Sequence, residues 1–155
     1  MDDSTQIIFT VISDNYGGTN RFVDDRVFLV IRYRSGKTEL YIQWNKYLDY
    51  DYDTKRVRVI TKIGDKEPVS ESWSSSTNHK ATFYRGSVQE FIEKIANNDT
   101  LLCETTPYNK NPVTTEFDVR GLKDLARQYI QYLKWDFLIP ELPGIFTPAY
   151  LKIEE

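Results

Sequence analysis

The sequence predicts a mainly β fold, an antiparallel β-sandwich or partly open barrel that also contains two helices. Three observations support this class. About eight short β-branched and aromatic runs recur at roughly ten-residue spacing, and two stretches have helical periodicity instead. Aromatic residues are plentiful (Trp 3, Tyr 11, Phe 8), a composition that favours strands. At 155 residues, the chain is long enough for one domain that buries roughly 70% of its unfolded surface.

The clearest element is a hairpin in residues 27–44, after a first strand over residues 5–12. Two apolar runs flank a Ser35-Gly36 turn signal. A two- or four-residue turn aligns their apolar faces, whereas a three-residue turn mixes them. The aligned residues would be Leu29, Ile31 and Tyr33 in the first strand and Leu40, Ile42 and Trp44 in the second. The other face would bring Arg32 and Arg34 near Glu39, a charge pair worth at most ~1 kcal/mol.

Further strands are predicted on both sides of a first helix. Residues 56–63, 69–75 and 81–84 precede it, and residues 101–106 and 113–119 form a second hairpin after it. Ser87 and Glu90 have the spacing of a capping box, and the helix should end at Asn97-Asn98. Its predicted buried face consists of Val88, Phe91, Ile92, Ile95 and Ala96.

A second helix is predicted from Leu122 to about Lys134, and the prolines that follow cannot continue it. We therefore divide the chain into a β-sandwich domain, residues 1–136, and a Pro-rich apolar C-terminal strap, residues 137–155. The strap has too many large apolar side chains for a free tail, so it should pack on this domain or on another chain. Its candidate partner-binding residues are Phe137, Leu142, Ile145 and Phe146.

Composition argues against several classes of partner. The net charge is −3, with 20 basic and 23 acidic residues interspersed, so no nucleic-acid partner is predicted. The N-terminus lacks a basic, apolar signal pattern, and no run of about 18 apolar residues occurs, so no membrane insertion is predicted. Cys103 is the only cysteine, which excludes an intrachain disulfide and suggests an inert buried thiol.

No metal site, cofactor or catalytic residue is predicted. Asp49, Asp51 and Asp53 alternate as in a calcium loop, but the sixth position is Thr54 and the twelfth is Ile60. His79 is the only histidine, and no zinc-ligand spacing surrounds it. A hydrolase that uses His79 with one of the nearby serines, 74 to 76, remains an alternative, although no G-x-S-x-G elbow is present. Gly17-Gly18 lies in a loop, 14–26, whose ligand binding stays open.

Tyrosines near the end of the first hairpin form the other candidate binding site. Aromatic side chains with one polar edge are enriched at protein and glycan contacts. The candidate partner-binding residues are Tyr41, Trp44, Tyr47, Tyr50 and Tyr52. Core packing of about half of them is the alternative.

Several separated blocks between Met1 and Leu125 together resemble one protein family. They are Asp2-Asp3-Ser4 before a strand, LVIRY followed by KTELYIQW, WSSSTNHKATF, and TPYNKNPVTTEFDVRGL. This pattern is similar to the type VI secretion-associated VasI/TagO family, which also occurs in phage and prophage genomes. The resemblance implies a small β-rich accessory module, exported or envelope-associated, with no established catalytic residues. The chain departs from the family in having Tyr33 where a cysteine is common, and in lacking a leader.

The favoured hypothesis is a non-enzymatic accessory module that binds another protein or an envelope component through its aromatic strand face and its Pro-rich end. Homo-oligomerisation through the C-terminal segment is also possible. The location would be the envelope or periplasm if a leader was removed, and the cytoplasm if the chain is complete. A phage- or prophage-encoded cytoplasmic inhibitor, which occludes a host factor or sequesters a small ligand, is the second hypothesis.

Overall fold

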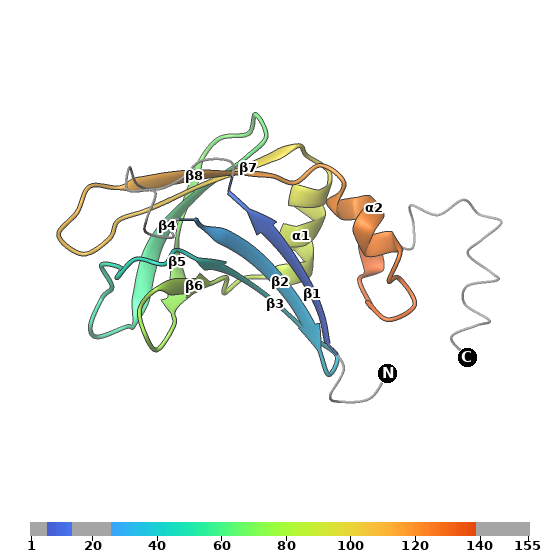
Figure 1. Cartoon of the computed structure of the whole chain (residues 1–155), viewed down its shortest axis with the longest axis horizontal. Helices are drawn as coiled ribbons and strands as arrows, with labels where there is room; N and C mark the ends of the chain where they lie inside the picture. The colour runs from blue at the N-terminus through green and yellow to red at the C-terminus, as the bar shows by residue number, and fades with distance from the viewer. Residues whose placement is uncertain (1–5, 14–25, 139–155) are drawn as a thin grey trace.

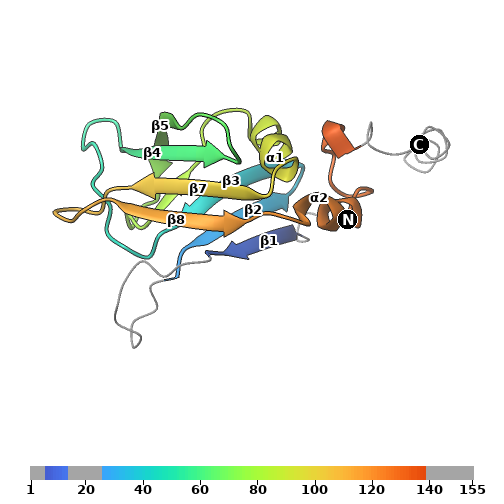
Figure 2. The same cartoon turned by 90° about the horizontal axis from the view of Figure 1, so that it is seen from above.

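A computed structural model describes residues 6–13 and 26–138 of the chain (Figure 1). Within these residues the fold is mainly β, as predicted, with one antiparallel sheet in the order β1-β2-β3-β6-β5-β4-β7-β8 and two α-helices. The sheet is strongly curved, so its edge strands β1 and β8 approach each other (Figures 1 and 2). It is an open, curled sheet, which is the partly open barrel of the two predicted architectures.

The elements are β1 (Gln6–Ile12), β2 (Phe28–Arg34), β3 (Lys37–Gln43), β4 (Arg56–Ile63), β5 (Val69–Ser75), β6 (Ala81–Phe83), α1 (Val88–Ala96), β7 (Thr100–Thr105), β8 (Val113–Asp118), α2 (Leu122–Arg127) and a 3₁₀ turn, η1 (Asp136–Leu138).

The β2–β3 hairpin has the two-residue turn. Ser35 and Gly36 have φ values of 52° and 78°, both in the left-handed region that a type I′ turn requires. Ile31 therefore lies opposite Leu40, and Leu29 lies opposite Ile42. All four of these side chains are buried, so the predicted alignment of apolar faces is confirmed.

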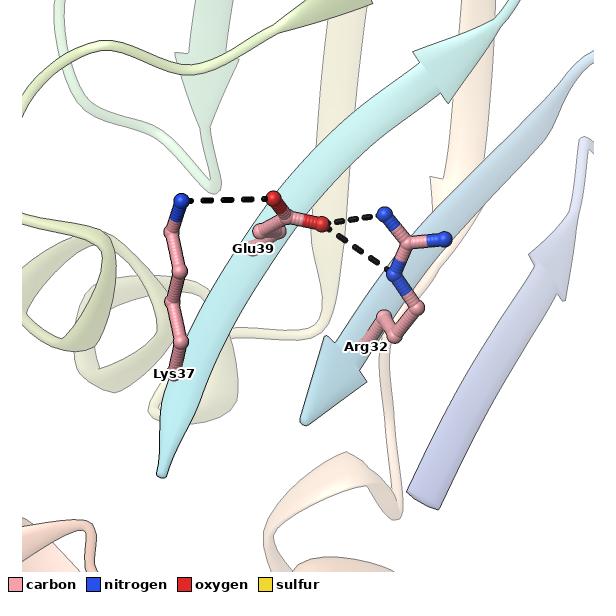
Figure 3. A network of polar contacts seen from close by, with 3 residues as sticks. All are labelled: Arg32, Lys37 and Glu39. Atoms are coloured by element: carbon pink, nitrogen blue, oxygen red, sulfur yellow. Dashed lines mark hydrogen bonds and ion pairs between the residues drawn. The ribbon is translucent and has the colours of Figure 1, made fainter. Parts of the chain in front are cut away.

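A cross-strand ion pair lies on the outer face of this hairpin (Figure 3). Arg32 lies directly opposite Glu39, and its Nε donates a hydrogen bond of 3.1 Å to Oε2 of the carboxylate. The Lys37 Nζ is 3.6 Å from the other carboxylate oxygen. The hydrogen bond from Arg32 lowers the pKa of Glu39, against the opposing effect of burial, and the same contact raises the pKa of Arg32. Arg34 instead lies opposite Lys37.

The concave face of the sheet holds one apolar core. Trp44, Trp73 and Trp135 are among its largest fully buried side chains. Helix α1 contributes Phe91, Ile92 and Ile95 to this core, as its periodicity predicted. Cys103 is buried in β7, and burial raises the pKa of its thiol.

The predicted capping box of α1 is wrong in one respect, because Ser87 is the N-cap residue but its side chain forms no capping hydrogen bond. The helix end is as predicted, with Asn97 as the C-cap residue. Amphipathic packing, rather than the cap, therefore accounts for most of the stability of α1.

The second helix is shorter than predicted. It ends at Arg127, after which hydrogen bonds to the third preceding residue replace the α-helical pattern, for example from the Tyr129 N–H to the Ala126 carbonyl at 3.0 Å. This tightening turns the chain back over the sheet. There the Trp135 Nε1 donates a hydrogen bond of 2.9 Å to Thr38 Oγ1. Tertiary contacts of Trp135 thus override the helical periodicity, which continues to about Lys134 in sequence.

The domain boundary proposed at 136/137 falls within the packed structure. Phe137 and Leu138 are buried with the core, and the Phe137 ring stacks on Trp135 at a centroid distance of 6.0 Å. Residues 139–155, which include most of the predicted strap, lie outside the described residues. No helix in the described segments is long and apolar enough to cross a membrane.

Substitution of Gly36 tests the turn that sets the hairpin register. A methyl group at Gly36 would meet no atom within 4 Å, so Gly36→Ala changes only the backbone energy at φ = 78°. We expect it to lower the free energy of unfolding by about 1 kcal/mol, because L-residues are disfavoured in this region. Ser35→Asn is the matched control, since Asn-Gly suits a type I′ turn and should leave stability equal or higher. Urea denaturation measures both changes, and equal loss in the two variants would contradict the turn assignment.

The Glu39 pair predicts a specific acid dependence. Because the folded-state pKa of Glu39 is lowered, the pair stabilises the fold above the unfolded-state pKa and loses this effect as the pH falls through the folded-state value. Glu39→Gln should therefore reduce the melting temperature at pH 7 and have little effect at the acid end of the titration. Asp124→Asn, which changes an exposed carboxylate paired with Arg127 in α2, is the control and should change little at either pH. A Glu39→Gln effect that is independent of pH would rule out the ion pair as its cause.

Candidate functional site

Three loops meet at one end of the sheet, at the left of Figure 1. They are the β3–β4 connection, residues 44–55, the β5–β6 turn, residues 76–80, and the β7–β8 connection, residues 106–112. Backbone hydrogen bonds join them. The Leu48 N–H donates to the His79 carbonyl at 2.9 Å, and the Tyr108 N–H donates to the Tyr47 carbonyl at 2.9 Å. The loops therefore form one ordered surface instead of three independent connections.

Five aromatic side chains, Tyr47, Tyr50, Tyr52, His79 and Tyr108, form what we call the aromatic loop cluster. The Tyr50 and His79 rings are stacked, with centroids 3.8 Å apart and an interplanar angle of 4°. Tyr47 meets the rings of Tyr50, His79 and Tyr108 edge-on, at centroid distances of 6.3, 5.6 and 6.1 Å. A hydrogen bond with Tyr50 raises the pKa of the Tyr47 phenol.

The outer part of the cluster is strongly exposed. The exposed fractions are 48% for Tyr47, 74% for Tyr52 and 56% for Tyr108. The Lys55 ammonium lies 4.1 Å from the centroid of the Tyr52 ring, which is a cation–π contact. Tyr52 is thereby held in place although it is exposed.

A cleft of about 530 Å³ lies beside Tyr47 and Tyr108. Its lining is mainly apolar and includes Pro107 and Pro112, with Lys46 and Lys110 as the only charged residues among the described residues that form it. The cleft can therefore accept an apolar or aromatic group and favours a negative charge close to it.

His79 does meet a serine, and that serine is Ser75. The Ser75 Oγ lies 2.9 Å from His79 Nδ1 and 3.0 Å from the Ser76 carbonyl oxygen. A hydroxyl has one proton, so donation to the Ser76 carbonyl makes Nδ1–H the donor to Ser75 Oγ. With the other tautomer the Ser75 hydroxyl donates to Nδ1, so the contact joins Ser75 to His79 across the turn in either case. His79 also has a positive φ of 59°, which fixes the turn that presents its ring to Tyr50.

The three alternating aspartates do not surround a common centre. The Asp51 carboxylate accepts hydrogen bonds from the Asp53 and Thr54 N–H groups, at 2.9 and 3.0 Å, and the Thr54 hydrogen bond in particular lowers its pKa. Asp51 thus stabilises a turn. In the segments that the structure describes, no three His, Cys, Asp or Glu side chains are grouped so that they could hold a metal ion.

The structure places the predicted aromatic residues in different environments. Trp44, one of the candidate partner-binding residues, is fully buried, and its Nε1 donates a hydrogen bond of 3.0 Å to Thr82 Oγ1. The physical reason is its alignment with the inward-facing residues of β3. Tyr41 is partly exposed, but it stacks on Phe83 at 4.7 Å, outside the loop cluster. Phe137 is buried, and Leu142, Ile145 and Phe146 lie outside the described residues.

Tyr108 is the residue of this surface that the sequence analysis missed. Its position could have been inferred from topology, because strands that alternate in direction along the chain place every second connection at the same end of the sheet. The β3–β4 and β7–β8 connections are such a pair. Comparison of the chain with protein-family models, curated proteins and solved structures finds no match. Function is therefore inferred from the geometry of this surface.

The stacking of His79 predicts a structural role for its ring. We expect His79→Asn to lower the free energy of unfolding by about 1 kcal/mol, since an aromatic contact is lost while asparagine tolerates the positive φ. Thr77→Ala changes an exposed residue of the same turn and should have little effect. Thermal denaturation compares the two variants. Unchanged stability of His79→Asn would show that the stack does not hold the turn.

Proposed function

We propose that this chain is a non-enzymatic binding module that contacts another protein through the aromatic loop cluster. The observation that carries this proposal is the exposure of Tyr47 and Tyr108 beside a cleft bordered by two lysines, together with the exposure of Tyr52 on the same loop as Tyr47. Tyrosine is enriched at the energetically important centres of protein interfaces, because it combines a large apolar ring with a hydrogen-bonding hydroxyl.

The rigidity of the loops supports binding over a role as simple connections. Main-chain hydrogen bonds link the three loops, for example from the Asp49 N–H to the Thr106 carbonyl at 3.0 Å. A surface that is ordered before binding loses less conformational entropy when a partner docks. The cluster is therefore suited to a specific contact.

The charge of the surface limits the chemistry of the partner. Lys46 and Lys110 line the cleft, whereas the loop that carries Tyr50 and Tyr52 also holds the exposed Asp49, Asp51 and Asp53, so the positive charge is confined to the cleft. A protein segment with aromatic or proline side chains next to Asp or Glu would match both the cleft and the lysines. The two lysines of the cleft are what would orient such a segment.

The sequence resemblance supports an accessory role for this binding. In a relative of the VasI/TagO family, the partner would be another secretion or envelope component. In a phage or prophage product, the same surface would occlude a host protein. Genome neighbourhood separates these two settings, since secretion-sheath genes favour the first and phage genes the second.

The proposal predicts which tyrosines a partner requires. Tyr47→Ala and Tyr108→Ala should each weaken partner capture by about tenfold or more, as expected for truncation of interface hot spots. Tyr132→Ala is the matched control, because Tyr132 has a similar exposed fraction of 40% but follows α2, outside the loop cluster. Quantitative mass spectrometry of proteins retained by the immobilised full chain compares the three variants with the wild type. If all retained proteins are insensitive to both cluster variants, this surface is not the binding site.

A further inference from the structure

We propose that the open edge of β1 is a second binding surface, which accepts an extended and uncharged segment of a partner protein as an added strand. This surface is separate from the aromatic loop cluster. It is formed by the β1 main chain together with helix α2. The proposal goes beyond the proposed function, and its test does not depend on that function.

The first observation is the direction of the β1 main chain. β1 pairs with β2, and no other strand of the described chain forms a ladder with it. The Ser13 N–H donates to the Val27 carbonyl at 2.9 Å, in register with that pairing. Hydrogen-bonding direction alternates along a strand. The main-chain N–H and C=O groups of Val11, Phe9 and Ile7 therefore also point toward β2. The N–H and C=O groups of Ile8, Thr10 and Ile12 therefore point away from β2, toward the edge that β8 approaches without pairing.

The second observation is that β1 lacks the features that usually protect an edge strand. Its sequence, QIIFTVI, contains no charge and no proline, and its pairing with β2 is continuous without a bulge. Ile8 and Ile12 are 48% and 47% exposed, so the outer face is apolar as well as the inner one. The other edge strand, β8, differs because it carries Glu116 and Asp118. This contrast favours β1 as the edge that takes up a strand.

The third observation is a groove of about 320 Å³ along the same strand. Its walls are Gln6–Thr10 of β1 and two residues of the α2 region, Leu125 and Tyr129. These two are 40% and 38% exposed, and Tyr129 also contacts the Phe9 ring edge-on at 5.9 Å. None of the described residues that line the groove is charged, so its occupant should be uncharged and aliphatic. An open edge beside an apolar helix wall is the geometry of peptide recognition by strand addition.

The direct test uses the full chain, labelled with ¹⁵N, and a defined probe. The probe is a synthetic peptide of alternating Val and Thr, with a lysine at each end for solubility. We expect the NMR chemical shifts of the β1 amides to change with peptide concentration until they reach saturation. We also expect slower amide exchange at Ile8, Thr10 and Ile12, with little change at Phe9 and Val11, which are already bonded to β2.

Two substitutions of Thr10 distinguish the contribution of the main-chain N–H to peptide binding from that of the side chain. Thr10→Pro removes an edge-facing N–H without removing a bond to β2, and proline is tolerated on edge strands. It should weaken peptide binding by about tenfold, whereas Thr10→Val should bind as the wild type does. If Thr10→Pro does not fold, Ile8→Lys places a charge on the same edge and should have the same effect. Tyr47→Ala should not alter peptide binding, which distinguishes this surface from the loop cluster.

Four results would overturn the proposal. The first is the absence of saturable shifts, and the second is equal binding by wild type and Thr10→Pro. The third is protection of the Ile8, Thr10 and Ile12 amides in the free monomer, which would mean that other residues of the chain already cover the edge. The fourth is a dimer in sedimentation experiments that Thr10→Pro dissociates, which would identify a second copy of the chain as the occupant.

Discussion

The two-residue turn between β2 and β3 is the constraint on which the rest of the structure depends. Its left-handed residues, Ser35 and Gly36, fix which residues of the two strands are opposite each other. A shift of one residue would turn Leu29 and Ile31 away from the core, because side chains alternate strictly between the two faces. The same alternation continues past the end of β3 and places Trp44 in the core. From there the Trp44 side chain reaches Thr82 in β6, the strand that links β3 to β5.

Burial of Trp44 also determines where the aromatic loop cluster begins. With Trp44 facing inward and Leu48 buried, the chain between them has to return to the surface, and Tyr47 is exposed there. The main-chain hydrogen bonds of Leu48 and Tyr47 then connect this loop to the other two. The candidate site is thus a consequence of the core register and needs no separate folding unit. Its exposed rings lie on loops that are stabilised mainly by the buried core residues beneath them.

Much of the fold could be predicted from the sequence because its signals are local. The hairpin turn, the strand alternation of Val57 and Val59, and the apolar face of α1 each depend on residues a few positions apart. The end of α2 could not be predicted in this way, because it depends on Trp135 binding Thr38, which is distant in sequence. The same dependence on distant residues explains why only part of the candidate site could be predicted. Tyr47 and Tyr52 could be named from their local pattern, whereas Tyr108 and His79 join them only through the pairing of strands.

The five rings of the cluster divide into two groups that differ in what they stabilise. His79 and Tyr50 are partly buried and stacked on each other, so their contact contributes to the stability of the loops. Tyr47, Tyr52 and Tyr108 leave about half or more of their surface in water, and folding therefore gains little from that part of their apolar area. An aromatic side chain that contributes little to the core and is nevertheless held in a fixed position is better explained by a contact outside the chain. The inner pair contacts Tyr47, Tyr47 contacts Tyr108, and Lys55 contacts Tyr52, so each outer ring has a neighbour in the loops while much of its surface stays exposed.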